Sequence, residues 1–89
     1  MTEKQLEQKL IAEVSTHGGI AYKFVSPGHV GVPDRVVLLP GGRVVFVEVK
    51  APGAGRLSKM QEREIRRIRE LGVECYVLDK PELIERIIT

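Results

Sequence analysis

The apolar positions of this chain change their spacing several times, and each change marks the boundary of a predicted element. Apolar residues recur at helical spacing near both ends and after residue 57, whereas they alternate or run together in between. Clusters of glycine and proline separate these stretches. The predicted elements are a helix to about His17, strands over Ile20–Val25 and Arg35–Leu39, a strand over Arg43–Val47 that leads into Glu48, a helix capped by Ser58 and stopped by Gly72, a strand over Val73–Leu78, and a short helix begun by Pro81.

Both longer helices carry the same signal at their start. Thr2 with Gln5, and Ser58 with Gln61, have the spacing of a capping box. The fourth strand follows a helix, so we expect it to run parallel to the third strand or to a neighbour. The order αβββαβα predicts an α/β fold with a mixed four-stranded sheet flanked by helices, in a single domain over residues 1–89.

The two middle strands form a predicted hairpin that brings two carboxylates together. Gly41-Gly42 is a strong turn signal. If the loop has three residues, Leu39 pairs with Arg43, and counting along the ladder places Asp34 opposite Glu48. Cross-strand partners on one face have Cβ atoms roughly 4.5–5.5 Å apart, which is close enough for both carboxylates to bind one divalent ion.

The register remains open at this point, because a two-residue loop would pair Asp34 with Val49 and leave the carboxylates at neighbouring positions. Lys50 shares the face of Glu48. An ordinary hairpin with solvated charges at its ends is the alternative. Against it, Val44–Val47 is apolar on both faces, which predicts a central strand covered on both sides. Charges at the end of such a strand are costly to desolvate without a partner or a metal.

Composition limits the classes of protein that the chain can belong to. With 89 residues, 43% hydrophobic and 29% charged, it is predicted to be a small globular domain of a size that dimerisation often stabilises. Cys75 is the only cysteine, which excludes a disulfide framework and a zinc cluster and suggests a core residue. We find no signal peptide and no apolar run of membrane-spanning length, so we expect a cytoplasmic protein without a membrane partner.

The net charge of +2 does not by itself indicate a nucleic-acid partner, but its distribution is informative. Six basic residues lie within fourteen positions: Arg56, Lys59, Arg63, Arg66, Arg67 and Arg69. They predict either a phosphate-facing patch or a solvated helix with Glu62–Arg66 and Arg66–Glu70 pairs.

The element order, with Pro33-Asp34 on the second strand and Glu48-x-Lys50 on the third, resembles the PD-(D/E)xK nuclease superfamily. Four blocks over nearly the whole chain resemble the VRR-NUC family more closely: Lys23–Gly28, Gly31–Arg35, Phe46–Gly53 and Leu57–Gln61. That family includes small stand-alone phage and bacterial nucleases and the catalytic domain of the Fanconi-associated nuclease.

The resemblance implies a Mg²⁺ or Mn²⁺ site with no other cofactor. Its ligands would be Asp34, Glu48 and the backbone carbonyl of Val49. An acidic residue on the first helix would complete it, and Glu7 matches that residue better than Glu3 does. Carboxylate ligands agree with a hard cation rather than with zinc.

Two further residues of the predicted site come from the resemblance. Lys50 would orient the attacking water or stabilise charge on the phosphate. Gln61 would contact the water or metal shell, although its capping box is an alternative role. Other charged or polar residues are candidate contacts to nucleic acid: Lys23, Ser26, Arg35, Arg56 and Lys59. His29, alone in a loop, is expected to be a surface residue.

These observations predict a Mg²⁺- or Mn²⁺-dependent endonuclease of phage or bacterial origin that cuts DNA. One site per chain favours a homodimer, whose two sites would suit a two-fold substrate. Stand-alone members of the family resemble four-way-junction resolvases in this respect, so the resemblance implies branched DNA such as four-way junctions. The alternatives are a subunit of a restriction or RNA-processing system and a non-catalytic nucleic-acid-binding module. Intact Asp34, Glu48 and Lys50 argue against the non-catalytic alternative.

Overall fold

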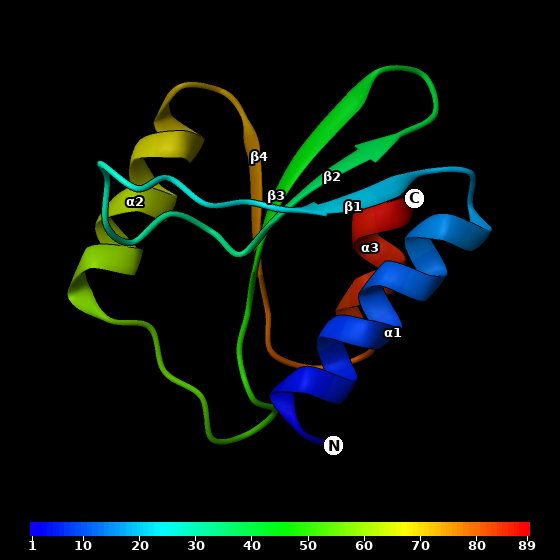
Figure 1. Ribbon diagram of the computed structural model, residues 1–89, viewed down its shortest axis with the longest axis horizontal. Helices are drawn as coiled ribbons and strands as arrows, with labels where there is room; N and C mark the ends of the chain where they lie inside the picture. The colour runs from blue at the N-terminus through cyan, green and yellow to red at the C-terminus, as the bar shows by residue number, and fades with distance from the viewer.

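A mixed four-stranded sheet with helices on both sides forms the protein, as the computed structural model shows for all residues from Met1 to Thr89 (Figure 1). The observed order αβββαβα agrees with the predicted one. The elements are α1 (Glu3–Thr16), β1 (Ile20–Lys23), β2 (Arg35–Leu39), β3 (Arg43–Val49), α2 (Lys59–Glu70), β4 (Glu74–Leu78) and α3 (Leu83–Ile88).

The strands lie in the order β1-β2-β3-β4, with antiparallel pairs between the first three and a parallel pair between β3 and β4. Leu39 pairs with Arg43, so the hairpin loop has three residues, and the two-residue alternative is wrong. The same register pairs Arg35 with Val47 and brings Asp34 to the level of Glu48. The helical crossover places β4 parallel to β3, as expected.

Helices α1 and α3 pack together on one face of the sheet, whereas α2 lies on the other face, over β4 (Figure 1). The hydrophobic core fills the layer between the sheet and the α1–α3 pair: Leu6, Leu10, Val14, Ala21, Val37, Leu39, Val45, Val47, Val49, Leu78, Ile84 and Ile87. None of the helices combines the length and the apolar character that a membrane span requires.

The opposite face of the sheet is only partly covered, which corrects one prediction. We expected the third strand to be buried on both faces, but the Val44 residue is 42% exposed to solvent. Helix α2 covers the β4 side of the sheet and leaves the hairpin end of this face open (Figure 1). An apolar pattern on both sides of β3 therefore does not mean that helices cover both sides.

Both predicted capping boxes form. Thr2 pairs reciprocally with Gln5, and Ser58 with Gln61. Several boundaries differ from the sequence prediction by one or two residues. Strand β1 ends two residues early because the chain leaves the sheet for a turn in which the His29 N–H donates to the Ser26 carbonyl. Helix α3 begins at Leu83, after a turn that contains Pro81.

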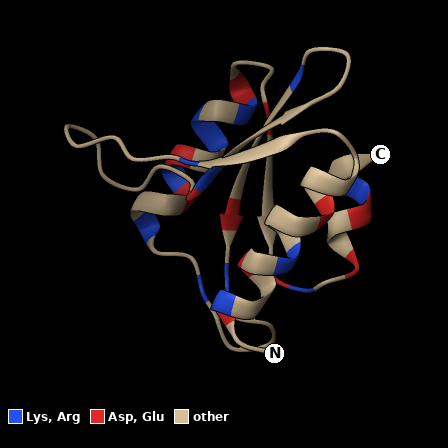
Figure 2. Ribbon diagram, turned by 45° about the vertical axis from the view of Figure 1, so that its right-hand side comes forward, with Lys and Arg blue, Asp and Glu red and all other residues tan.

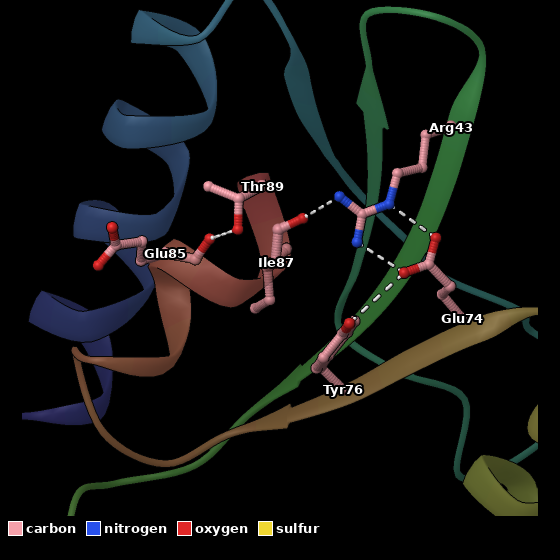
Figure 3. A network of polar contacts seen from close by, with 6 residues as sticks. All are labelled: Arg43, Glu74, Tyr76, Glu85, Ile87 and Thr89. Atoms are coloured by element: carbon pink, nitrogen blue, oxygen red, sulfur yellow. Dashed lines mark hydrogen bonds and ion pairs between the residues drawn. The ribbon is translucent and has the colours of Figure 1, made fainter.

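A polar network ties the hairpin end of the sheet to the last helix (Figure 3). Arg43 makes two parallel bonds to the Glu74 carboxylate, at 2.7 and 2.6 Å, and donates to the Ile87 carbonyl at 2.7 Å. The bonds between the two side chains raise the pKa of Arg43 and lower that of Glu74. The Arg43 guanidinium also adds positive charge at the C-terminal end of α3, where the helix dipole favours it.

Replacing Arg43 with alanine should therefore destabilise the fold by about 1 kcal/mol, because charge-assisted bonds at a partly exposed site contribute modestly. Urea unfolding followed by circular dichroism measures this change. The exposed Arg63 on α2 makes no side-chain hydrogen bond or ion pair, so Arg63→Ala is the matched control and should leave the midpoint unchanged. Equal midpoints for the two variants would show that the network does not hold α3.

Candidate active site

Asp34 stands at the end of the β1–β2 loop, directly before β2, and its position is fixed by a bond across the sheet. Its Oδ2 accepts from the Val49 N–H at 3.0 Å. The preceding Pro33 is fully buried and anchors the chain at this point. The carboxylate of Asp34 is thereby held beside the last residues of β3, as the predicted register requires.

Glu48 is the central group of the site. Its side chain is only 2% exposed, although it is a carboxylate. Oε2 accepts from the Gln61 side chain at 2.9 Å and lies 3.4 Å from the Lys50 ammonium, whereas Oε1 is buried without any partner. Burial, and secondly the charge of Asp34, raise the pKa of Glu48 to about 7, against the opposing effect of Lys50.

Gln61 serves the helix and the site at the same time. Its Oε1 accepts from the Ser58 N–H at 2.9 Å, completing the capping box, while its Nε2 donates to Glu48 Oε2. The two roles that sequence reasoning set against each other are compatible because they use different atoms of the amide. The cap orients the amide so that its nitrogen faces Glu48.

Lys50 is held beside Glu48 by the connector between β3 and α2. Its side chain is 16% exposed. The connector turns back on itself, and the Gly55 N–H donates to the Ala51 carbonyl at 2.9 Å. A Cβ on Gly55 would lie 2.9 Å from the Lys50 Cβ and 2.6 Å from the Ala51 nitrogen, so only glycine lets the connector pass this close.

Glu7 is paired with Arg35, the residue that follows Asp34. Its Oε2 accepts from Arg35 Nε at 2.8 Å, and Arg35 also donates to the Ala21 carbonyl at 3.3 Å. No set of three or more acidic, histidine or cysteine side chains comes together as a metal cluster. Glu3 is exposed. Asp34 and Glu48 are thus the two carboxylates that the fold brings together.

The candidate DNA contacts fall into two groups. Lys23, Arg56 and Lys59 are exposed and make no side-chain hydrogen bond or ion pair. Ser26 is half-buried, and Arg35 is occupied by its bonds to Glu7 and to the backbone.

Sequence reasoning missed the pairing of His29 with Glu64, whose atoms Nε2 and Oε2 are 2.7 Å apart. Glu64 follows Gln61 by three residues, so the two side chains lie on the same side of α2. This spacing is the one feature of the sequence that indicates an inward-facing position for Glu64. Cys75 is buried, and desolvation raises the pKa of its thiol to about 11, so it belongs to the core as expected.

Comparison with known proteins agrees with this geometry. The profile of the VRR-NUC domain matches residues 1–80. The chain belongs to the VRR-NUC family of nuclease domains. It is 52% identical over 81 residues to a protein of Acyrthosiphon pisum secondary endosymbiont phage 1 named "Putative nuclease p44", covering 91% of this chain and 86% of that protein. A solved structure described as a VRR_NUC domain superposes with a TM-score of 0.89 at 27% identity, covering 98% of this chain and 95% of its own.

The raised pKa of Glu48 predicts how the stability of the metal-free protein depends on pH. The folded state binds this proton more tightly than the unfolded state does. The contribution of Glu48 to stability is therefore greatest below pH 4.5, the ordinary pKa of a glutamate, and decreases until the pH passes about 7. The decrease should be on the order of 3 kcal/mol.

Urea unfolding in EDTA between about pH 5 and pH 8 measures this decrease. Glu48→Gln is the control, because it keeps both histidines and removes only this titration. The difference in unfolding free energy between wild type and variant should change across the range. A constant difference would show that Glu48 titrates normally.

Proposed function

We propose that the protein is a Mg²⁺- or Mn²⁺-dependent endonuclease that hydrolyses phosphodiester bonds of DNA. One observation carries the proposal: Glu48 is a buried carboxylate with an unpartnered Oε1, beside the second carboxylate of Asp34. Two acidic groups that share a buried position repel each other, and a divalent cation relieves that repulsion. Membership of the VRR-NUC family and the name of the phage relative support the same activity.

The residues present fit such an ion. Mg²⁺ prefers oxygen ligands and usually keeps several waters, so one or two carboxylates suffice to hold it. Asp34, Glu48 and the Val49 carbonyl would be its protein ligands. When bound, the ion lowers the pKa of a water and offsets negative charge on the phosphate. Glu7 could join this set only by leaving Arg35.

The side chains around the carboxylates have separate tasks in this proposal. Gln61 binds Oε2 of Glu48 and leaves Oε1 free for the cation. Lys50 keeps its ammonium 3.4 Å from Glu48, where it can donate to a water or to a phosphate oxygen. A fixed cation at the position where negative charge develops stabilises the transition state.

Basic side chains support DNA as the substrate. Figure 2 shows Lys and Arg gathered along α2, the helix that supplies Gln61 to the site. The predicted Glu62–Arg66 and Arg66–Glu70 pairs are not among the ion pairs of the structure. Arg66 therefore remains free to face phosphates, as do Lys23, Arg56 and Lys59.

Asp34→Ala and Glu48→Gln should abolish metal-dependent cleavage of labelled DNA while the circular dichroism spectrum stays that of wild type. Lys50→Ala should lower the turnover rate by about two to three orders of magnitude and change metal affinity much less. Arg86→Ala is the control for a surface change away from the site. Wild-type rates in the Asp34 or Glu48 variant would overturn the assignment.

We further propose that the protein is a homodimer that acts on branched DNA such as four-way junctions. The open sheet face supports this. Leu38 lies between Ile20 on β1 and Val44 on β3, and all three side chains are exposed, as is Tyr22 on β1. Exposed apolar patches mark interaction surfaces. A second copy on this face would give the two sites that a two-fold substrate needs.

Sedimentation at micromolar concentration should show a dimer for wild type and a monomer for Leu38→Glu, because a charge in the interface would be desolvated. Val30→Glu, at an exposed loop position outside the sheet, should remain dimeric. Leu38→Glu should also lose paired cuts on a four-way junction. A wild-type monomer, both free and on the junction, would contradict the proposal.

A further inference from the structure

Glu64 is a second buried carboxylate, separate from Asp34 and Glu48. It is 7% exposed and lies on the inner side of α2. A carboxylate in such a position is strongly unfavourable without a partner. Glu48 and Glu64 are the only buried charged residues of the chain, and the chemistry proposed above uses only Glu48.

The partner of Glu64 comes from a distant segment. His29, in the loop between β1 and β2, donates from Nε2 to Glu64 Oε2 at 2.7 Å. An ionised carboxylate only accepts, so the hydrogen is on Nε2. Figure 1 shows this loop extending from the sheet to α2. The bond therefore fastens the loop to the helix.

A second contact holds the same loop against α2. Gly31 has a φ of 93°, and a Cβ there would lie 2.8 Å from the Met60 carbonyl oxygen, so only glycine fits. Next to the pair, a cavity of about 310 Å³ opens between the loop and the helix, bordered by Phe24, Val32 and Phe46. Packing is thus discontinuous here, and the His29–Glu64 bond bridges the gap.

The two residues of this bond lie on elements that also carry residues of the site. The loop ends at Asp34, whose carbonyl accepts from the Phe24 N–H at 2.8 Å and closes the base of the loop. On the helix, Glu64 is three residues from Gln61, about one turn, and Gln61 binds Glu48. The bond thereby links the element that carries Asp34 to the element that orients Glu48.

We propose that His29 and Glu64 are positioning residues that set the placement of Asp34 relative to Glu48. The proposal rests on the proposed function of that site, but the placement can be measured without it. The Val49 amide donates to Asp34 Oδ2, so its nitrogen–proton NMR signal reports where the Asp34 carboxylate lies.

The test compares the wild-type protein with four variants. His29→Ala should move the Val49 amide signal, weaken Mn²⁺ binding in calorimetry by about tenfold or more, and lower kcat with little change in KM for DNA. His29→Gln, whose amide can still donate to Glu64, should restore these values. His17→Ala is the matched control: the ring of this histidine hydrogen-bonds to the Glu13 carbonyl in its own helix, and its loss should change none of the three readouts.

The double variant His29→Ala/Glu64→Gln separates positioning from stability. His29→Ala leaves the buried Glu64 carboxylate without its partner, and Glu64→Gln removes that charge. The thermal stability lost in His29→Ala should therefore recover in the double variant, while metal affinity and kcat stay low. If thermal stability, metal affinity and kcat all recover, the pair is only structural and the proposal is wrong. An unchanged Val49 signal in His29→Ala would also overturn the proposal. A wild-type protein that neither binds Mn²⁺ nor cuts DNA would overturn the proposed function instead, and the Val49 signal would still decide the positioning claim.

Discussion

The structure depends on keeping a carboxylate inside the protein at the end of β3. Glu48 is almost inaccessible to water, and its neighbours supply the polar partners that water would otherwise provide. Gln61 and Lys50 satisfy one of its oxygens and leave the other without a partner. A fold selected only for stability has no need of such a group, because an unsatisfied buried oxygen is destabilising. This arrangement is the reason that we propose a cation site at Glu48.

The two ends of strand β3 have different tasks. One end stabilises the fold, and the other carries the proposed chemistry. At its first residue, Arg43 binds Glu74 and the end of α3, and this network is complete (Figure 3). At its other end, Glu48 is incompletely satisfied and its pKa is raised to about 7. A perturbed pKa is typical of functional sites, whereas paired surface charges are typical of structural ones.

Much of the fold could be predicted because its signals are local. The capping boxes at Thr2 and Ser58 and the glycine turn at Gly41 each act within a few residues, and the structure reproduces them. The hairpin register followed from one loop length, which brought Asp34 to the level of Glu48. Family resemblance then supplied roles that spacing alone could not assign.

Other features depend on contacts between distant segments and leave little trace in the sequence. His29 and Glu64 are 35 residues apart, and nothing local to either residue signals their pairing. The open face around Val44 has the same apolar pattern that a helix-covered face would have. Glu7 was placed by resemblance in the metal site, but in this structure it binds Arg35, a choice that depends on side-chain geometry.

The most direct test of the central claim is a crystal structure of the protein with Mn²⁺, in which anomalous scattering locates the ion. We expect one peak about 2 Å from an oxygen of both Asp34 and Glu48, with Oε1 of Glu48 among the ligands. A peak elsewhere, such as at His29 and Glu64, would contradict it. So would the absence of a peak at millimolar Mn²⁺ with Oε1 still unpartnered.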